Sequence, residues 1–172
     1  ATVYNVNKNL VITLKDSKGN ALNGVNITVQ LKDAKTYTTN KNGQIKVPTK
    51  GLIPKIYTAK ITFKGNTNYE KTSKNTVKVT VKKATPKITA KKKTFKKAKK
   101  VKKYTITLKS GKTPIKKVQV TLKIKGKTYK AKTNAKGKAT FKITKLNKKG
   151  TYKSKITYKG SKYFKKSTKS VK

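Results

Sequence analysis

The side chains of this sequence that could do chemistry are almost all lysines. Of its 172 residues 49 are basic, and every one of these is lysine, whereas only three are acidic, so the formal net charge is +46. Ammonium groups attract carboxylates, sulfates and phosphates. The densest run of lysines surrounds Phe95. Its members are the candidate anion-binding residues: Lys91, Lys92, Lys93, Lys96, Lys97, Lys99, Lys100, Lys102 and Lys103.

This lysine-rich run has two interpretations. In the first, it binds anionic wall polymer, acidic glycan, phospholipid head groups or nucleic acid through charge. In the second, it is a solvated face without a specific partner, and the lysine excess reflects the codon usage of an A/T-rich genome. Specific nucleic-acid binding is disfavoured, because the sequence contains no arginine and no recognised nucleic-acid module.

The residue types that the sequence lacks exclude most enzymatic chemistry. It has neither cysteine nor histidine, so thiolate nucleophiles, zinc-ribbon sites and the usual general base are missing. Its acids, Asp16, Asp33 and Glu70, are scattered, and none follows residue 70. We therefore predict no catalytic residue, no cofactor and no metal site. No apolar run of membrane-spanning length occurs, and no signal peptide is visible, as expected for a mature or excised segment.

The chain contains one pattern twice, about 94 residues apart. Lys60–Gly65 returns as Lys155–Gly160, and Thr39–Gly43 returns as Thr133–Gly137. A period of this length suits a small sandwich domain rather than a solenoid unit. We predict two domains, residues 1–84 and 85–172, joined at the short linker Lys82–Pro86.

Charge is divided unevenly between these halves. Residues 1–84 hold 16 lysines and all three acids (+13), whereas residues 85–172 hold 33 lysines and no acid (+33). The second half should therefore repel itself and fold better in salt or against an anionic partner. Hydrophobic residues make up only 33% of the chain, which indicates a thin core in each half.

Alternation with period two is the dominant pattern of both halves. Its longest example is Val118–Ile124, where the apolar residues are separated by Gln119, Thr121 and Lys123. About seven short strands per half, with no helical stripe, predict an all-β protein of two β-sandwiches. Asn42-Gly43 and Lys136-Gly137 are predicted to form matching hairpin turns.

Each half resembles a known family of repeats. The resemblance rests on these motifs: Leu14…Val25-x-Ile27-x-Val29…Thr39-Asn40-x-x-Gly43, Tyr57-x-x-x-Ile61-x-Phe63-x-Gly65, Leu108, Val118-x-Val120-x-Leu122, Thr133-Asn134-x-x-Gly137 and Tyr152-x-x-x-Ile156-x-Tyr158-x-Gly160. They are similar to the immunoglobulin-like (Big-type) repeats of adhesin-like surface proteins, especially those of methanogenic archaea. The resemblance implies immunoglobulin-like sandwiches, an extracellular position at the cell surface or cell wall, and a role as a stalk or in adhesion. Tyr57 and Tyr152 also resemble the structural tyrosine corner of such sandwiches.

Two further features concern the surface and the ends. Asn26 begins the one N-x-Thr sequon, and in a secreted chain it is a candidate glycosylation site. The first half starts shortly before Leu10, whereas the second is preceded by the extra strand-like segment Lys87–Ala90. Conversely, the last strand of the first half, Thr76–Lys82, is matched in the second only by Ser170–Lys172. An incomplete sandwich exposes an edge that another chain can pair with.

The sequence therefore predicts a non-enzymatic, adhesin-like segment that acts as a stalk, as an electrostatic binder of anionic cell-wall or glycan polymer, or as both. One alternative is a subunit of a surface filament, in which Ala1–Asn9 completes the sandwich of a neighbour; the competing explanation is a chain cut at a convenient point. A second alternative is a module that binds nucleic acid or other polyanions.

Overall fold

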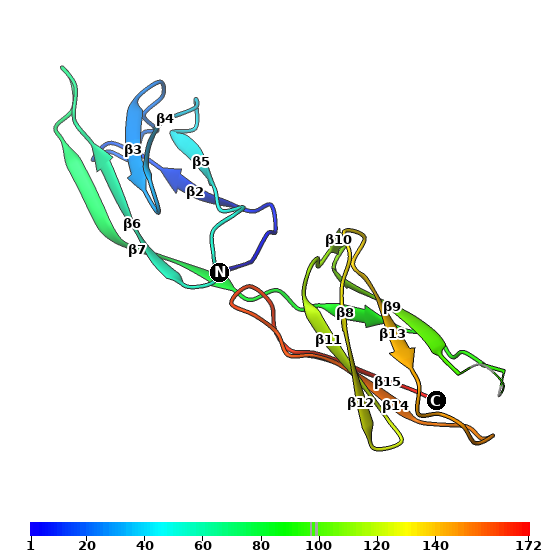
Figure 1. The fold of residues 1–172 in the computed structure, drawn as a ribbon. Coiled ribbons are helices and arrows are strands. Elements are labelled where there is room, and N and C mark those ends of the chain that lie inside the picture. The colour runs from blue at the N-terminus through cyan, green and yellow to red at the C-terminus, as the bar shows by residue number, and fades with distance from the viewer. Residues whose placement is uncertain (97, 99) are drawn as a thin grey trace. The chain divides into compact units, whose positions relative to one another are not determined.

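The described residues of the chain form strands only. Figure 1 shows the computed structural model, which describes residues 1–96, 98 and 100–172. No helix occurs in these ranges, and several sheets are present, so the predicted all-β fold of sandwich type is confirmed. The chain divides into two compact units, which are here called unit 1 (Ala1–Lys83) and unit 2 (Ala84–Lys172).

Unit 1 consists of a five-stranded sheet and a two-stranded sheet. The strands are β1 (Thr2–Val3), β2 (Asn9–Thr13), β3 (Asn26–Gln30), β4 (Ala34–Thr38), β5 (Gln44–Pro48), β6 (Ile56–Phe63) and β7 (Thr72–Lys82). The larger sheet has the order β1-β7-β6-β3-β4, and β2 pairs with β5 in the smaller one. Only β1 and β7 run parallel, with Thr2 opposite Val81.

Unit 2 repeats this plan with fuller pairing. Its strands are β8 (Lys87–Thr89), β9 (Lys102–Ser110), β10 (Thr113–Pro114), β11 (Gln119–Ile124), β12 (Lys127–Lys132), β13 (Lys138–Ile143), β14 (Ser154–Tyr158) and β15 (Ser167–Val171). One sheet has the order β10-β9-β13, with β8 also pairing with β9, and the other has the order β12-β11-β14-β15. The segment Lys87–Ala90 thus contains a strand, and the last strand starts earlier than the predicted Ser170–Lys172.

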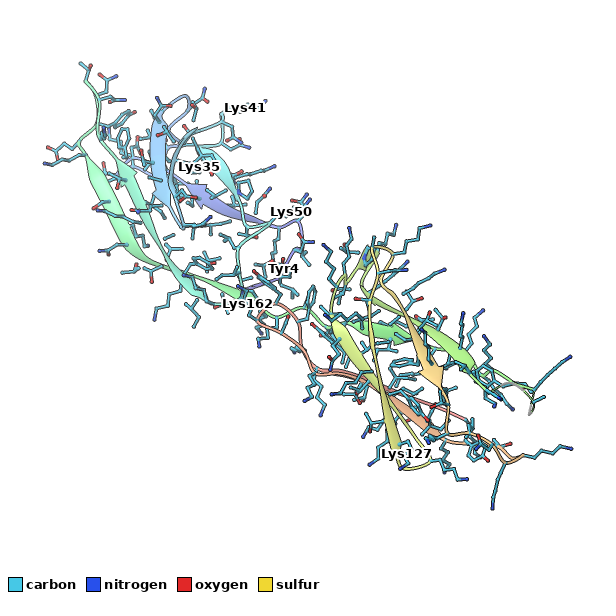
Figure 2. The ribbon with its side chains drawn as sticks, in the orientation of Figure 1. Tyr4, Lys35, Lys41, Lys50, Lys127 and Lys162 are labelled. Atoms are coloured by element: carbon cyan, nitrogen blue, oxygen red, sulfur yellow. The ribbon has the colours of Figure 1, made fainter. Side chains whose placement is uncertain are left out.

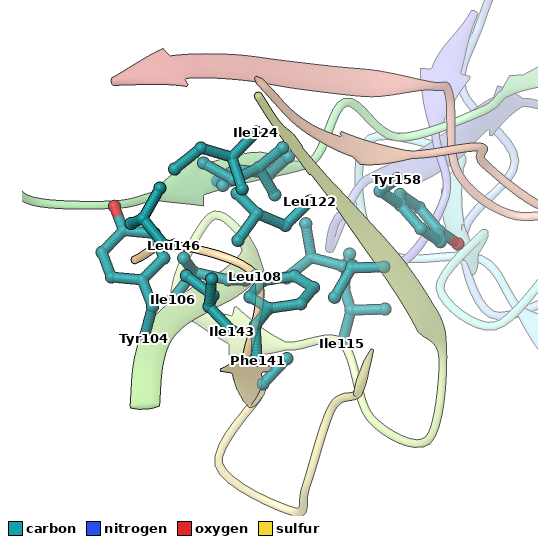
Figure 3. Packing of buried hydrophobic residues seen from close by; sticks show 14 residues of the cluster. Tyr104, Ile106, Leu108, Ile115, Leu122, Ile124, Phe141, Ile143, Leu146 and Tyr158 are labelled. Atoms are coloured by element: carbon teal, nitrogen blue, oxygen red, sulfur yellow. The ribbon is translucent and has the colours of Figure 1, made fainter. Parts of the chain in front are cut away.

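The alternating residues of β9, β11, β13 and β14 meet in one core in unit 2. Phe141, Leu108, Leu122 and Ile156 are completely buried there, and Figure 3 shows the first three packed around one another. In unit 1 the buried residues fall into two smaller clusters, one centred on β3 and β5 and the other on β6 and β7. Unit 2 therefore has the larger continuous core, although it also carries most of the charge.

The extra strand β8 accounts for part of this difference. Leu108 of β9 is completely buried and lies opposite Ile88 of β8. Its counterpart in unit 1, Leu14, is half-buried. The strand β2 pairs only with β5, because the N-terminal strand β1 pairs with β7 and not with β2. A single short strand thus decides how deeply its neighbour is buried.

The two predicted glycine turns do not form hairpins. The turn at Asn42-Gly43 joins β4, which pairs with β3, to β5, which pairs with β2. The turn at Lys136-Gly137 likewise joins β12 and β13, which pair with β11 and β9. Both turns therefore carry the chain from one sheet to the other. The prediction was wrong because a turn motif identifies a change of direction but not the sheet to which the next strand belongs.

Gly137 is expected to be indispensable for this passage between sheets. Its φ is +71°, and a Cβ at this position would meet the carbonyl oxygen of Leu108. We expect Gly137→Ala to lower the free energy of unfolding of unit 2 by about 2–3 kcal/mol, since strain at a left-handed position and a backbone clash add together. Urea unfolding measures the loss, with Gly111→Ala as the control.

Gly111 suits this comparison because its φ is also positive, at +55°, but no atom lies within 4 Å of its added Cβ. The control should therefore lose only the strain contribution, about 1 kcal/mol. Equal losses in the two variants would show that the contact with Leu108 is unimportant.

Candidate functional site

The described members of the lysine-rich run that was predicted to bind anions do not form one surface. Lys91, Lys92, Lys93, Lys96 and Lys100 lie between β8 and β9 and are exposed, and Lys102 and Lys103 begin β9. Lys97 and Lys99 lie outside the described residues. Because neighbouring residues of a strand point to opposite faces, Lys102 and Lys103 are directed away from each other. Lys102 thus lies on the inner side of β9 and Lys103 on its outer face.

Lys102 is the unexpected member of this run, because it is only 4% exposed. It lies opposite Ile143 in the ladder and shares the inward-facing parity of Tyr104 and Ile106. The interpretation of the whole run as a solvated face is therefore wrong for this residue. The sequence contained the necessary signal, since Lys102 continues the alternation of Tyr104, Ile106 and Leu108 by one step.

A cleft of about 370 Å³ opens beside Lys102. Lys92 and Lys93 from the predicted run line it, together with Lys148 and Lys149, which lie far from that run in the sequence. Its apolar wall consists of Phe95, Tyr104, Leu122, Ile124, Ile143, Leu146 and Tyr152. The cleft thus combines a rim rich in ammonium groups with an aromatic and aliphatic floor, and unit 2 has no acidic residue to neutralise that rim.

Backbone carbonyl groups hold the polar atoms around this cleft in place. The hydroxyl of Tyr104 donates a hydrogen bond of 2.8 Å to the carbonyl oxygen of Lys91, and Lys93 Nζ donates one of 3.0 Å to the carbonyl oxygen of Lys103. Burial raises the pKa of Tyr104 and so favours the protonated hydroxyl that donates this hydrogen bond. These bonds fasten the segment after β8 to the start of β9.

The outer face of the β8–β9–β13 sheet carries only lysine and threonine. We call it the lysine face, and its outward-facing residues are Lys87, Thr89, Lys103, Thr105, Thr107, Lys109, Lys138, Thr140 and Lys142. Lys103 lies directly opposite Lys142, and Lys87 lies directly opposite Lys109. Figure 2 shows nitrogen-tipped side chains projecting from the strands of unit 2. Like charges in directly opposed positions destabilise a sheet, so this face favours a bound anion.

The other sheet of unit 2 contains a third such pair, Lys123 opposite Lys155. In unit 1 the corresponding pair is Gln30 and Lys60, and the position of Lys103 and Lys142 is taken by Asn9 and Pro48. Unit 1, all of whose residues are described, has no directly opposed lysines in its ladders. The two units therefore differ in the presence of opposed lysines as well as in total charge.

The three acidic residues of the sequence all lie outside the strands. Asp16 accepts hydrogen bonds from the side chain and the backbone of Asn20, and these bonds lower its pKa. Asp33 is exposed and pairs with the adjacent Lys32 at 3.9 Å, and Glu70 is exposed in a loop. Within the described ranges no three potential ligands lie together.

The remaining candidate residues lie as follows. The hydroxyl of Tyr57 donates to the carbonyl oxygen of Ile53 at 3.1 Å, and that of Tyr152 donates to the carbonyl oxygen of Lys148 at 2.8 Å. In both units the acceptor lies four residues before the tyrosine. Asn26 is exposed on β3, where its Oδ1 accepts a hydrogen bond from Thr38. In the part of the chain that the structure describes, no helix is long and apolar enough to cross a membrane.

Comparison of this chain with known proteins finds similarity only to solved structures. No protein-family model matches it, and no curated protein matches it. One similar solved structure is a Ca²⁺-stabilised adhesin with which an Antarctic bacterium binds ice (15% identity, TM-score 0.34, covering 95% of this chain and 42% of that one). Another is a 1.5-MDa bacterial ice-binding adhesin (13% identity, TM-score 0.37, 95% and 62% coverage).

This chain thus spans less than two thirds of either structure. Both are bacterial adhesins, but likeness at this level carries no argument about what the present chain binds. The interpretation of its function therefore depends on its own residues.

Proposed function

We propose that the chain is a non-enzymatic, adhesin-like segment of a cell-surface protein, and that unit 2 binds anionic cell-wall or glycan polymer. The observation that supports this most is the concentration of opposed lysines on unit 2 in the absence of any acidic residue there. In the proposal, unit 1 acts mainly as a stalk. The immunoglobulin-like character of the repeats and their position outside the cell belong to the same proposal.

The mechanism is electrostatic. Each opposed pair holds two ammonium groups on Cβ atoms about 5 Å apart, so one phosphate, sulfate or carboxylate can interact with both. Along β9, Lys103 and Lys109 are six residues apart, which is about 20 Å. A linear polyanion that follows the strand can therefore reach both pairs on the lysine face. Binding releases counterions and relieves the repulsion between lysines, so affinity falls as salt rises.

A panel of anionic polymers tests this proposal. Polyglutamate, polyphosphate, poly(glycerol phosphate) and double-stranded DNA would be titrated into the full chain at 50 mM and 200 mM salt. A specific receptor for wall polymer keeps its affinity for poly(glycerol phosphate) at 200 mM while the other polymers dissociate. If all four polymers bind in order of charge density with parallel salt slopes, the chain is a general polyanion binder.

Charge-matched variants test whether unit 2 carries the binding. We expect Lys87→Gln, Lys109→Gln and Lys138→Gln together to weaken polymer binding roughly tenfold at 150 mM salt, because three contacts of the lysine face are lost. The control removes the same charge from exposed positions of unit 1, with Lys35→Gln, Lys46→Gln and Lys60→Gln, and should change affinity less than twofold. Equal losses would show that net charge, and not the lysine face, determines binding.

Strand exchange through Ala1–Asn9 is less favoured by the structure. Thr2 and Val3 pair with Val81 and Lys82 inside unit 1, and the backbone N–H of Tyr4 donates to the carbonyl oxygen of Lys82 at 2.8 Å. Donating this segment to a neighbour would break these bonds. Light scattering at high protein concentration tests the filament alternative directly, because strand exchange makes the mass rise with concentration.

A further inference from the structure

Corresponding edge strands of the two units differ in their outward-facing residues. β4 ends the order β1-β7-β6-β3-β4, and β12 ends the order β12-β11-β14-β15. On the outer face of β12, Lys130 and Lys132 are exposed opposite β11. At the offset of 94 residues their counterparts on β4 are Thr36 and Thr38, which are also exposed. Unit 1 thus has two uncharged hydroxyl groups where unit 2 has two ammonium groups.

This difference matters because an edge strand has backbone N–H and C=O groups that no neighbouring strand pairs with. Two such edges can pair with each other, and lysine side chains on an edge prevent this by repulsion. Lys35 is the only charged residue of β4, whereas β12 contains three lysines. Of these two edges, β4 is therefore the less protected by charge.

A different feature lies beside the β4 edge. Asn26 is directly opposite Thr38 and begins the sequon Asn26-Ile27-Thr28. In unit 2 the corresponding residue is Gln119, which lies opposite Lys132 and begins no sequon. Unit 1 thus combines a sequon with an uncharged edge, whereas unit 2 combines a charged edge with no sequon.

The side chain of Asn26 can carry a sugar in the folded unit. It is exposed, and its Oδ1 accepts a hydrogen bond of 2.8 Å from the hydroxyl of Thr38. An N-linked sugar is attached to the other side-chain atom of the amide, Nδ2. Because Thr38 contacts the oxygen and not the nitrogen, a sugar on Nδ2 leaves this hydrogen bond intact. The sugar is then held next to the β4 edge.

We propose that Asn26 carries an N-linked oligosaccharide, and that this oligosaccharide prevents β4 from pairing with β4 of a second copy of the chain. A bulky, hydrated group beside an edge blocks the approach of another strand without any charge. The proposal rests on the extracellular position proposed above, because N-x-Thr sequons are modified in secreted chains.

The oligosaccharide comes from a lipid-linked donor. The bond between Nδ2 and C1 of the first sugar forms, and the bond between C1 and the phosphate oxygen of the donor breaks. Nδ2 loses a proton, and the lipid phosphate leaves. In the folded unit Ile27 and Thr28 pair with β4 on one side and with β6 on the other, so a transferase cannot enclose them. The transfer therefore precedes folding of unit 1.

Synthesis of the full chain in microsomes tests the attachment. The chain is made behind a secretory leader, in membranes that contain the transferase and its lipid-linked donor. Intact mass should show one oligosaccharide on the unchanged chain and on Thr28→Ser, which keeps the sequon. It should show none on Thr28→Val. An unmodified parent chain, or a sugar that persists on Thr28→Val, would overturn the assignment to Asn26.

Light scattering of the purified chain, with and without its oligosaccharide, tests the shielding. At 0.15 M salt the Debye length is about 8 Å, so repulsion between more distant charges is largely screened. The glycosylated chain should stay monomeric. The same sequence made without the transferase should approach roughly twice the monomer mass, because two β4 edges pair in a closed twofold dimer. If the unglycosylated chain also stays monomeric, β4 needs no shield and the proposal fails.

Two lysines copied from unit 2 show whether β4 is the edge that associates. In the unglycosylated chain, Thr36→Lys and Thr38→Lys together reproduce Lys130 and Lys132 and should restore the monomer, because lysines facing each other across about 5 Å still repel at this salt concentration. Association that persists in this variant occurs elsewhere and would overturn the proposal. Neither measurement involves the lysine face, so polymer binding is tested separately.

Discussion

Replacing Phe141 with alanine is expected to leave unit 2 unfolded at low ionic strength while unit 1 remains folded. Phe141 is completely buried and belongs to the single core cluster of unit 2. Truncating a buried phenylalanine costs about 3–5 kcal/mol, whereas a whole domain is stable by only about 5–15 kcal/mol. Repulsion among the 33 lysines after residue 84 reduces that margin further.

Hydrogen exchange with mass spectrometry measures this effect separately in peptides from each unit. Amide protection should vanish in β9, β11, β13 and β14, and it should persist in β3 and β6. The control is Val47→Ala, which removes fewer buried atoms. Val47 occupies the corresponding position of unit 1, because it lies opposite Leu10 as Phe141 lies opposite Tyr104. Simultaneous loss of protection in both units by Phe141→Ala would show that they unfold as one cooperative body.

Raising the salt concentration should stabilise unit 2 much more than unit 1. The Debye length falls from about 30 Å at 0.01 M to about 3 Å at 1 M, so repulsion between exposed lysines is largely screened. Because unit 2 carries the larger charge and the opposed lysines, we expect its Tm to rise by roughly 10 °C over this range and that of unit 1 by only a few degrees. Calorimetry at several sodium chloride concentrations measures both transitions.

Two variants identify the source of this salt effect, each replacing a lysine of unit 2 with the residue found at the corresponding position of unit 1. Lys103→Asn and Lys123→Gln each break one opposed pair and should raise the stability of unit 2 at low salt by about 0.2–1 kcal/mol. Lys130→Gln is the matched control, because Lys130 is exposed and lies opposite Thr121 rather than another lysine. If all three variants stabilise equally, the effect comes from net charge and not from paired positions.

Prediction from the sequence succeeded where local pattern determines structure. Alternation identified the buried side of most strands, for example Val120 and Leu122, which are completely buried, between the outward-facing Gln119 and Lys123. The same alternation would have placed Lys102 inside, had it been followed past Tyr104. Sequence reasoning failed at the glycine turns, because it could not tell that Gly43 and Gly137 join different sheets.

The sequence by itself determined that this protein is built of strands, which residues face inward, and that its charge is concentrated after residue 84. These properties follow from side-chain type and the two-residue period of a strand, which are local. Only the tertiary structure decided which lysines oppose each other, how deeply Leu14 and Leu108 are buried, and that a cleft opens beside Tyr152. Those properties depend on which distant strands become neighbours and in what register, and no local pattern contains that information.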